Sequence, residues 1–172
     1  RVYGELRKAF PEKEIYTTEA TGWRESSNTE WKGSCNWGLK HNWLDGLTAG
    51  ASVGMQWNLV LDDKYGPTTR KDSLAVGLVT VNTDSWDSAM FEREFYCMAQ
   101  VSMAVRPGSV RIGHSIKPGG SNISALAVER SDESVALVVS NQNKKPRVVE
   151  VRYRGDRLKL SLKGNSVQTI IW

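Results

Sequence analysis

The last third of the chain alternates hydrophobic and polar residues with a period of two. In residues 157–163 leucines occupy every second position and alternate with lysine and serine, which is typical of a strand with one buried face. Residues 149–154 alternate in the same way. Gly155-Asp156, between these strands, predicts a two-residue hairpin turn because glycine adopts positive φ without strain. Similar short strands continue to the end of the chain, so residues 106–172 are predicted to form an antiparallel β-sandwich.

Residues 1–105 follow a different pattern, in which helices alternate with short apolar strands. The predicted helices are 2–10, 34–48 and 87–105, and the predicted strands are 14–18 and 51–57. Pro11 should end the first helix, and Gly50 stands where a left-handed C-cap would end the second. This order predicts parallel strands covered by helices. Two parallel strands cannot bury both faces by themselves, so this half is predicted to be a slice of a larger α/β domain.

The formal charge is uneven along the chain. The net charge is +4, but residues 1–105 carry 11 Lys/Arg against 14 Asp/Glu, whereas residues 106–172 carry 12 against 5. A basic half can bind nucleic acid or another anionic polymer. We favour the alternative that it docks on an acidic module, or that its lysines and arginines only decorate exposed strand faces. We place nucleic-acid binding last, since no Lys/Arg run is interleaved with aromatic residues.

The remaining composition narrows the chemistry. Cys35 and Cys97 lack the spacing of a metal site, and the sequence leaves open whether they pair. We therefore expect no metal and no cofactor. No stretch of about 18 apolar residues predicts a membrane span, and no secretory leader is visible at the start of the sequence. Asn122-Ile123-Ser124 matches a glycosylation sequon, which matters only in a secreted eukaryotic protein.

One carboxylate stands at a position typical of catalysis. Glu19 follows the apolar strand at 14–18, and in α/β barrels the catalytic residues lie at the carboxyl ends of the strands. The alternative is that Glu19 caps a helix or pairs with a cation.

Tryptophan and amide residues near this position favour a sugar ligand. Trp57 and Asn58 follow the second strand; an indole face stacks on a sugar ring while an amide binds its hydroxyls. Trp23 and Trp31 lie in the polar stretch after Glu19. Trp57 could instead be a packing aromatic.

These motifs together resemble glycoside hydrolase family 30. The resemblance runs in order along nearly the whole chain, through Tyr16-Thr17-Thr18-Glu19-Ala20, Gln56-Trp57-Asn58-Leu59-Val60-Leu61, Gly66-Pro67, Met90-Phe91, Gly108-Ser109-Val110-Arg111-Ile112-Gly113 and Trp172. Acid β-glucosidase (glucosylceramidase) enzymes are the members that it resembles most.

The resemblance implies a (β/α)8 barrel with a β-sandwich beside it and a retaining hydrolysis of β-glycosides. Residues 1–105 would be the C-terminal slice of the barrel, with its last two strands, and residues 106–172 the sandwich. Glu19 matches the nucleophile, Trp57 lines the subsite of the cleaved sugar, Asn58 adjoins it, and Trp23 follows in the next loop. The sequence does not determine the location; we expect a secreted, periplasmic or lysosome-like one over the cytoplasm.

The sequence also departs from the family pattern. The acid/base glutamate of the family follows an asparagine on the fourth strand, and this chain contains no Asn-Glu pair. Because one carboxylate cannot run the reaction alone, we expect the isolated chain to be inactive and to need the remainder of the barrel as partner, from the same protein or another chain. The alternative function is a non-catalytic carbohydrate-binding module.

Overall fold

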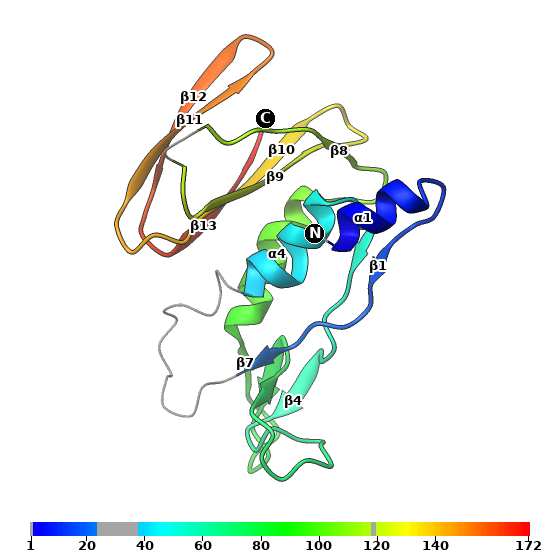
Figure 1. The fold of residues 1–172 in the computed structure, drawn as a ribbon. Coiled ribbons are helices and arrows are strands. Elements are labelled where there is room, and N and C mark those ends of the chain that lie inside the picture. The colour runs from blue at the N-terminus through cyan, green and yellow to red at the C-terminus, as the bar shows by residue number, and fades with distance from the viewer. Residues whose placement is uncertain (1, 24–37, 118–119) are drawn as a thin grey trace. The chain divides into compact units, whose positions relative to one another are not determined.

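The chain forms two compact units in a computed structural model that describes residues 2–23, 38–117 and 120–172 (Figure 1). The first unit is Arg1–Ala99 and the second is Gln100–Trp172. Helix α4 (Arg93–Ala104) continues from the first unit into the second. In the described ranges, no helix combines the length and the apolar character that crossing a bilayer requires.

The first unit begins with α1 (Val2–Ala9), which ends one residue earlier than the predicted helix and, as expected, before Pro11. A π-helix, η1 (Leu39–Leu44), continues directly into α3 (Asp45–Thr48). Leu39, Trp43 and Leu44 are buried, so this helical segment supplies much of the local core. Gly50 has φ of 105°, which confirms the predicted left-handed position after the helix.

The two predicted strands of this unit pair in parallel, as expected. β1 (Tyr16–Thr17) aligns Tyr16 with Val53 and Thr17 with Gly54 of β3 (Val53–Gly54). Gly54 permits the packing of Trp43, because a Cβ at residue 54 would lie 2.8 Å from Trp43 Cδ1. Two parallel strands do not form a barrel, and the closed barrel remains a prediction.

Two further small sheets complete the first unit. The antiparallel sheet joins β2 (Gly22–Trp23) to β5 (Ala75–Val76), and the mixed sheet joins β4 (Val60–Asp62), β6 (Val79–Val81) and β7 (Ala89–Phe91) in the order β4-β6-β7. The predicted helix at 87–105 is wrong in its first turns. Met90 and Phe91 instead pair with Thr80 and Val79, and the backbone of Glu92 donates to Leu78 before the helix begins.

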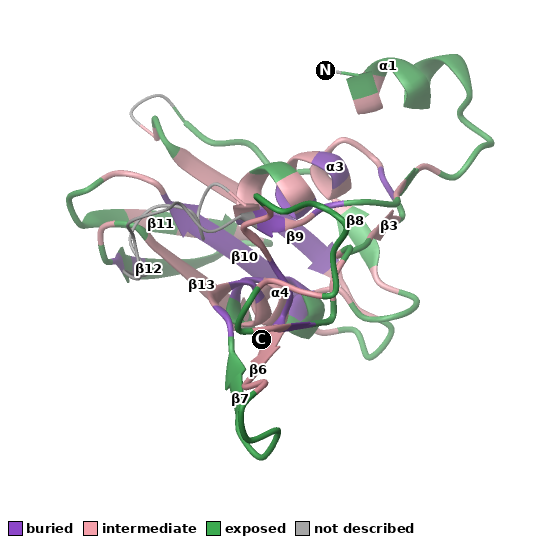
Figure 2. Ribbon diagram, turned by 90° about the horizontal axis from the view of Figure 1, so that it is seen from below, coloured by how far each residue is buried: buried purple, intermediate pink, exposed green. Residues whose placement is uncertain are grey.

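The second unit is the predicted antiparallel β-sandwich. One layer is a four-stranded sheet in the order β13-β10-β9-β8, and the other is the β11–β12 hairpin. The strands are β8 (Val110–Ile112), β9 (Ile123–Glu129), β10 (Val135–Asn141), β11 (Arg147–Tyr153), β12 (Asp156–Leu162) and β13 (Ser166–Ile171). Every residue of β10 is buried (Figure 2). The strand lies between β9 and β13, and its Leu137 and Val139 pack against Leu160 and Leu162 of the hairpin.

The hairpin turn lies one residue earlier than predicted. Tyr153 pairs with Asp156, so the turn residues are Arg154 and Gly155, with φ of 48° and 98°. Two successive positive φ values belong to the type I′ turn, whose twist matches that of the flanking strands. Asp156 is therefore the first residue of β12 and not part of the turn.

Candidate functional site

The parallel pairing of β1 and β3 continues beyond both strands and brings their carboxyl ends together. The backbone N–H of Ser52 donates to Ile15, that of Met55 donates to Thr17 (2.9 Å), and that of Trp57 donates to Ala20 (2.6 Å). The backbone of Trp57 is thus hydrogen-bonded to the residue that directly follows Glu19. The backbone places the two principal candidate residues on adjacent segments at one end of the sheet.

Glu19 is exposed, whereas the next residue, Ala20, is only 8% exposed. Ala20 anchors this segment in the core of the unit, and the carboxylate stays accessible to a ligand. Glu14, at the other end of β1, accepts a 2.7 Å hydrogen bond from the Tyr16 hydroxyl. This hydrogen bond, with the carboxylate charge, raises the pKa of Tyr16.

The two segments are also joined through side chains. Asn58 Nδ2 donates to Thr21 Oγ1 at 3.3 Å, in a partly buried position. Trp57, between this bond and the strand, is 63% exposed. An exposed indole next to a fixed amide can stack on one face of a sugar while polar groups bind its hydroxyls.

Of the two other tryptophans proposed from the sequence, the structure describes only the backbone of one. The backbone of Trp23 lies in β2, where it aligns with Ala75 of β5. Trp31 lies outside the described residues.

Three polar residues that the sequence interpretation did not single out lie in the same unit. Both amide atoms of Gln56 are buried and have no hydrogen-bond partner among the described residues. Glu94 is 8% exposed, accepts a 3.2 Å hydrogen bond from Arg93, and fills the space beside Gly22, where a Cβ would lie 2.6 Å from its Oε1. Glu94 Oε2 and Arg93 Nε have no hydrogen-bond partner within the described ranges.

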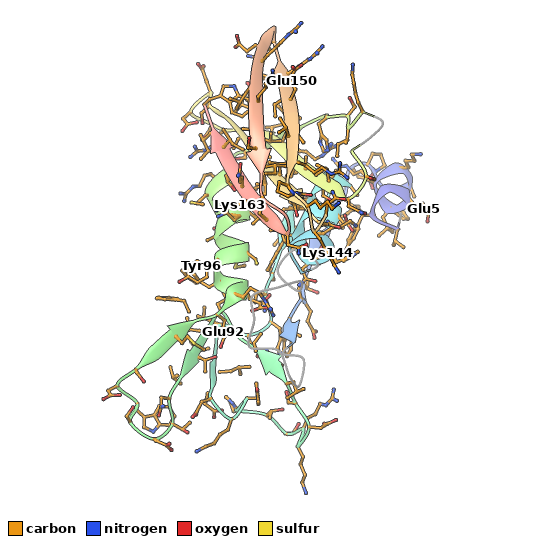
Figure 3. The ribbon with its side chains drawn as sticks, turned by 90° about the vertical axis from the view of Figure 1, so that its left-hand side faces the viewer. Glu5, Glu92, Tyr96, Lys144, Glu150 and Lys163 are labelled. Carbon is orange, nitrogen blue, oxygen red and sulfur yellow. The ribbon has the colours of Figure 1, made fainter. Side chains whose placement is uncertain are left out.

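A fourth such residue, Glu92, marks the start of α4 (Figure 3). It is 8% exposed and accepts a 2.6 Å hydrogen bond from the Thr80 hydroxyl of β6. The local pattern at residues 92–94, Glu-Arg-Glu before an apolar helix, predicts exposed polar side chains. Its burial depends on contacts with residues far away in the sequence, which the local pattern does not contain.

Neither a metal site nor a reactive thiol is evident in this part of the protein. Among the residues that the structure describes, no group of three or more His, Cys, Asp or Glu could hold a metal ion. Cys97 is 2% exposed and disulfide-bonded. Cys35 lies outside the described residues.

Comparison with known proteins connects this fold to glycoside hydrolases. The sequence model described as "Glycosyl hydrolase family 30 beta sandwich domain" matches residues 108–170. A search of curated proteins gave no match.

Several solved structures resemble the whole chain. The endo-β1,6-glucanase BT3312 aligns with a TM-score of 0.87 and 25% identity over 99% of this chain and 37% of its own. SrfJ from Salmonella typhimurium aligns with a TM-score of 0.83 and 20% identity over 99% of this chain and 37% of its own. The catalytic domain of xylanase C from Talaromyces cellulolyticus aligns with a TM-score of 0.68 and 20% identity, over 93% and 41%.

The chain thus spans well under half the length of these structures. Its β-sandwich matches the family model, and its fold agrees with that of an endo-β1,6-glucanase and a family 30 xylanase. The resemblance identified in the sequence is confirmed at the level of the family for the second unit: residues 108–170 match the glycoside hydrolase family 30 β-sandwich domain.

Proposed function

We propose that this chain is the C-terminal part of a retaining β-glycosidase, with Glu19 as its nucleophile. The observation that carries the proposal is the backbone hydrogen bond from Trp57 to Ala20. It holds together the two segments that carry the exposed Glu19 carboxylate and the exposed Trp57 indole, at the ends of two parallel strands. Catalytic residues of α/β barrels lie at such ends. Two of the similar solved structures are by name a glucanase and a xylanase.

In the proposed mechanism, the Glu19 carboxylate attacks the anomeric carbon and forms a glycosyl ester as the leaving oxygen takes a proton from a second carboxyl group. That second group then removes a proton from water, which hydrolyses the ester. Retaining enzymes hold the two groups about 5–5.5 Å apart. We assign the acid/base to the remainder of the barrel, and therefore propose that this chain is inactive alone.

The sugar subsite would combine stacking and hydrogen bonding. Trp57 would stack on the ring of the cleaved sugar, and Asn58, already fixed by Thr21, would bind a hydroxyl through its side-chain oxygen. Trp23 and Trp31 stay proposed as substrate-binding residues, as the sequence indicates. The buried amide of Gln56 is where we expect a hydrogen bond from the missing strands, because a buried amide without partners costs about 1–3 kcal/mol. We also propose that the substrate specificity is glucosylceramidase-like.

The proposal includes a location outside the cytoplasm. The disulfide at Cys97 supports a secreted, periplasmic or lysosome-like site, because structural disulfides persist in oxidising compartments.

The decisive experiment uses the full-length protein and an activated 2-fluoro β-glycoside, whose glycosyl ester hydrolyses slowly. Mass spectrometry of the digest should locate the sugar on the peptide containing Glu19. Glu19→Gln should abolish both this adduct and turnover, whereas Glu14→Gln, on the same segment, should preserve them. An adduct on another peptide, or normal turnover by Glu19→Gln, would refute the assignment.

A second experiment tests the dependence on the remainder of the barrel. The isolated 172-residue chain should hydrolyse β-glucosides no faster than buffer. Turnover clearly above that background would show that the chain holds both carboxyl groups itself.

A further inference from the structure

The positive charge of the second unit is concentrated in one hairpin. Residues 144–163, which we call the basic hairpin, contain β11, β12 and the lysines on either side of them. This segment carries eight Lys/Arg and two Asp/Glu, a net charge of +6, whereas the whole of residues 106–172 carries +7. The basic character is therefore a local feature and not a general decoration of the sandwich.

The strand register divides the hairpin into two faces. Val149 aligns with Leu160 on the inner face, and both pack into the core of the sandwich. The alternate pairs form the outer face: Arg152 with Arg157, Glu150 with Lys159, and Val148 with Ser161. All six outer residues are exposed, and the side chain of Glu150 keeps 31% of its surface accessible. The outer face is thus open to a ligand.

The outer face places two arginines directly opposite each other. Arg152 and Arg157 are cross-strand partners, and like charges in this arrangement destabilise a sheet. One carboxylate, Glu150, lies beside them and pairs with Arg152. The hydrogen bond from Arg152, followed by the charges of Arg152, Arg157 and Lys159, lowers the pKa of Glu150. Three cations therefore share one carboxylate, and the face keeps a positive excess.

Further lysines extend this charge to the other end of the hairpin. Lys163 continues the outward positions of β12, after Arg157, Lys159 and Ser161. Asn141 binds the loops on both sides of the hairpin, since its amide donates to Lys145 O (3.0 Å) and Lys163 O (2.9 Å). Figure 3 shows Lys144 and Lys163 at this end, with Glu150 nearer the turn. At about 3.4 Å per residue, cations from 157 to 163 span roughly 20 Å.

We propose that the outer face of the basic hairpin binds a carboxylate-bearing polysaccharide. A row of cations over this length fits an extended polyanion better than a small anion. Guanidinium groups bind carboxylates through two parallel hydrogen bonds, and a pair of them selects this chemistry over a neutral sugar. The choice of a polysaccharide among polyanions rests on the proposed glycosidase function.

The composition of the face favours this partner over others. Its three residue pairs contain no aromatic side chain, so it lacks the stacking platform on which single-stranded nucleic acid binds. The turn of the hairpin is Arg154-Gly155, followed by Asp156, and offers no apolar residue for insertion into a membrane. Arg154 instead pairs with Glu129 at 3.6 Å and lies over the Tyr153 ring.

The test is binding of the 172-residue chain to polygalacturonate, with fully methyl-esterified polygalacturonate as the uncharged control. We expect salt-sensitive binding to the acid and none to the ester. Arg152→Gln and Arg157→Gln should each weaken binding about tenfold. Arg152→Lys with Arg157→Lys should keep the salt dependence but bind more weakly than wild type. The control pair Lys8→Gln and Lys13→Gln, in the first unit, should bind as wild type.

Other outcomes would overturn the proposal. These are equal binding to the ester, unchanged binding by the arginine variants when circular dichroism shows them folded, or tighter binding to phosphatidylglycerol vesicles or to duplex DNA. Glu19→Gln should leave polygalacturonate binding unchanged. If the full-length enzyme cleaves β-glycosides but the chain ignores polygalacturonate, only the present proposal fails; if binding holds and Glu19 labelling fails, only the assignment of the nucleophile fails.

Discussion

The two units of this chain bury their hydrophobic residues to different degrees. In the second unit Ala136, Val138 and Leu162 are fully buried, and long strands connect them across two layers. In the first unit the sheets contain two or three short strands, and large side chains such as Phe10 and Trp57 are more than half exposed. The difference lies in the length of the strands: the sandwich connects its buried residues through strands of up to seven residues, whereas the strands of the first unit have two or three.

The largest expected effect tests the core of the sandwich. Leu162→Ala should destabilise the chain by about 2–5 kcal/mol, because it leaves a cavity between the hairpin and the sheet. Leu6→Ala in α1, at a side chain that is 42% exposed, should change stability by less than about 1 kcal/mol. Urea unfolding followed by circular dichroism measures both. Similar losses would mean that α1 is as well packed as the sandwich.

A smaller effect tests the packing behind the candidate site. Gly54→Ala should cost about 1–3 kcal/mol, because its Cβ would overlap Trp43 and force the indole to move. Gly4→Ala is the matched control: nothing lies within 4 Å of its Cβ, and alanine favours a helix by about 0.5–1 kcal/mol. The same unfolding experiment should give opposite signs for the two variants. A neutral Gly54→Ala would show that Trp43 is loosely held.

The next effect tests the connection between the two strand ends. Thr21→Val removes the acceptor of the Asn58 amide and should cost about 0.5–1.5 kcal/mol. Thr18→Val, at an exposed position of the same segment, should cost less. In the full-length enzyme, Thr21→Val should also raise KM more than it lowers kcat. Equal effects of the two valine variants would contradict a role for this hydrogen bond.

The smallest effect concerns pH and the turn between β9 and β10. Hydrogen bonds from the Ser134 hydroxyl and then from its backbone N–H lower the pKa of Asp132. A group with a lowered folded-state pKa stabilises the fold above its unfolded pKa, about 3.9, and loses this contribution as pH falls through the folded pKa. The stability difference between wild type and Asp132→Asn should therefore be present at pH 7 and shrink toward pH 3. A difference independent of pH would exclude this carboxylate as its source.

How much the sequence predicts depends on the length of the periodic pattern. The leucines of β12 define both faces of a seven-residue strand, so the hairpin and the sandwich follow from local alternation. Strands such as β6, with three residues, are too short for a period to appear. Met90 and Phe91 were predicted to be helical for the same reason, since they adjoin a true helix.

The candidate site divides in the same way. Apolar strands ending in Glu19 and Trp57 predict that these residues come together, because parallel strands share an edge. The burial of Gln56 and the packing of Glu94 beside Gly22 depend on residues far apart in the sequence. Such long-range contacts leave no trace in the local pattern.

The backbone hydrogen bond between Trp57 and Ala20 has a practical consequence for the design of chimeric proteins. Successive residues of an extended segment point to opposite sides, so adding or deleting one residue between positions 15 and 20 would rotate Glu19 away from its present side. Exchanges of sequence between related hydrolases should therefore transfer residues 15–20 and 52–57 as one unit and place the splice points outside both.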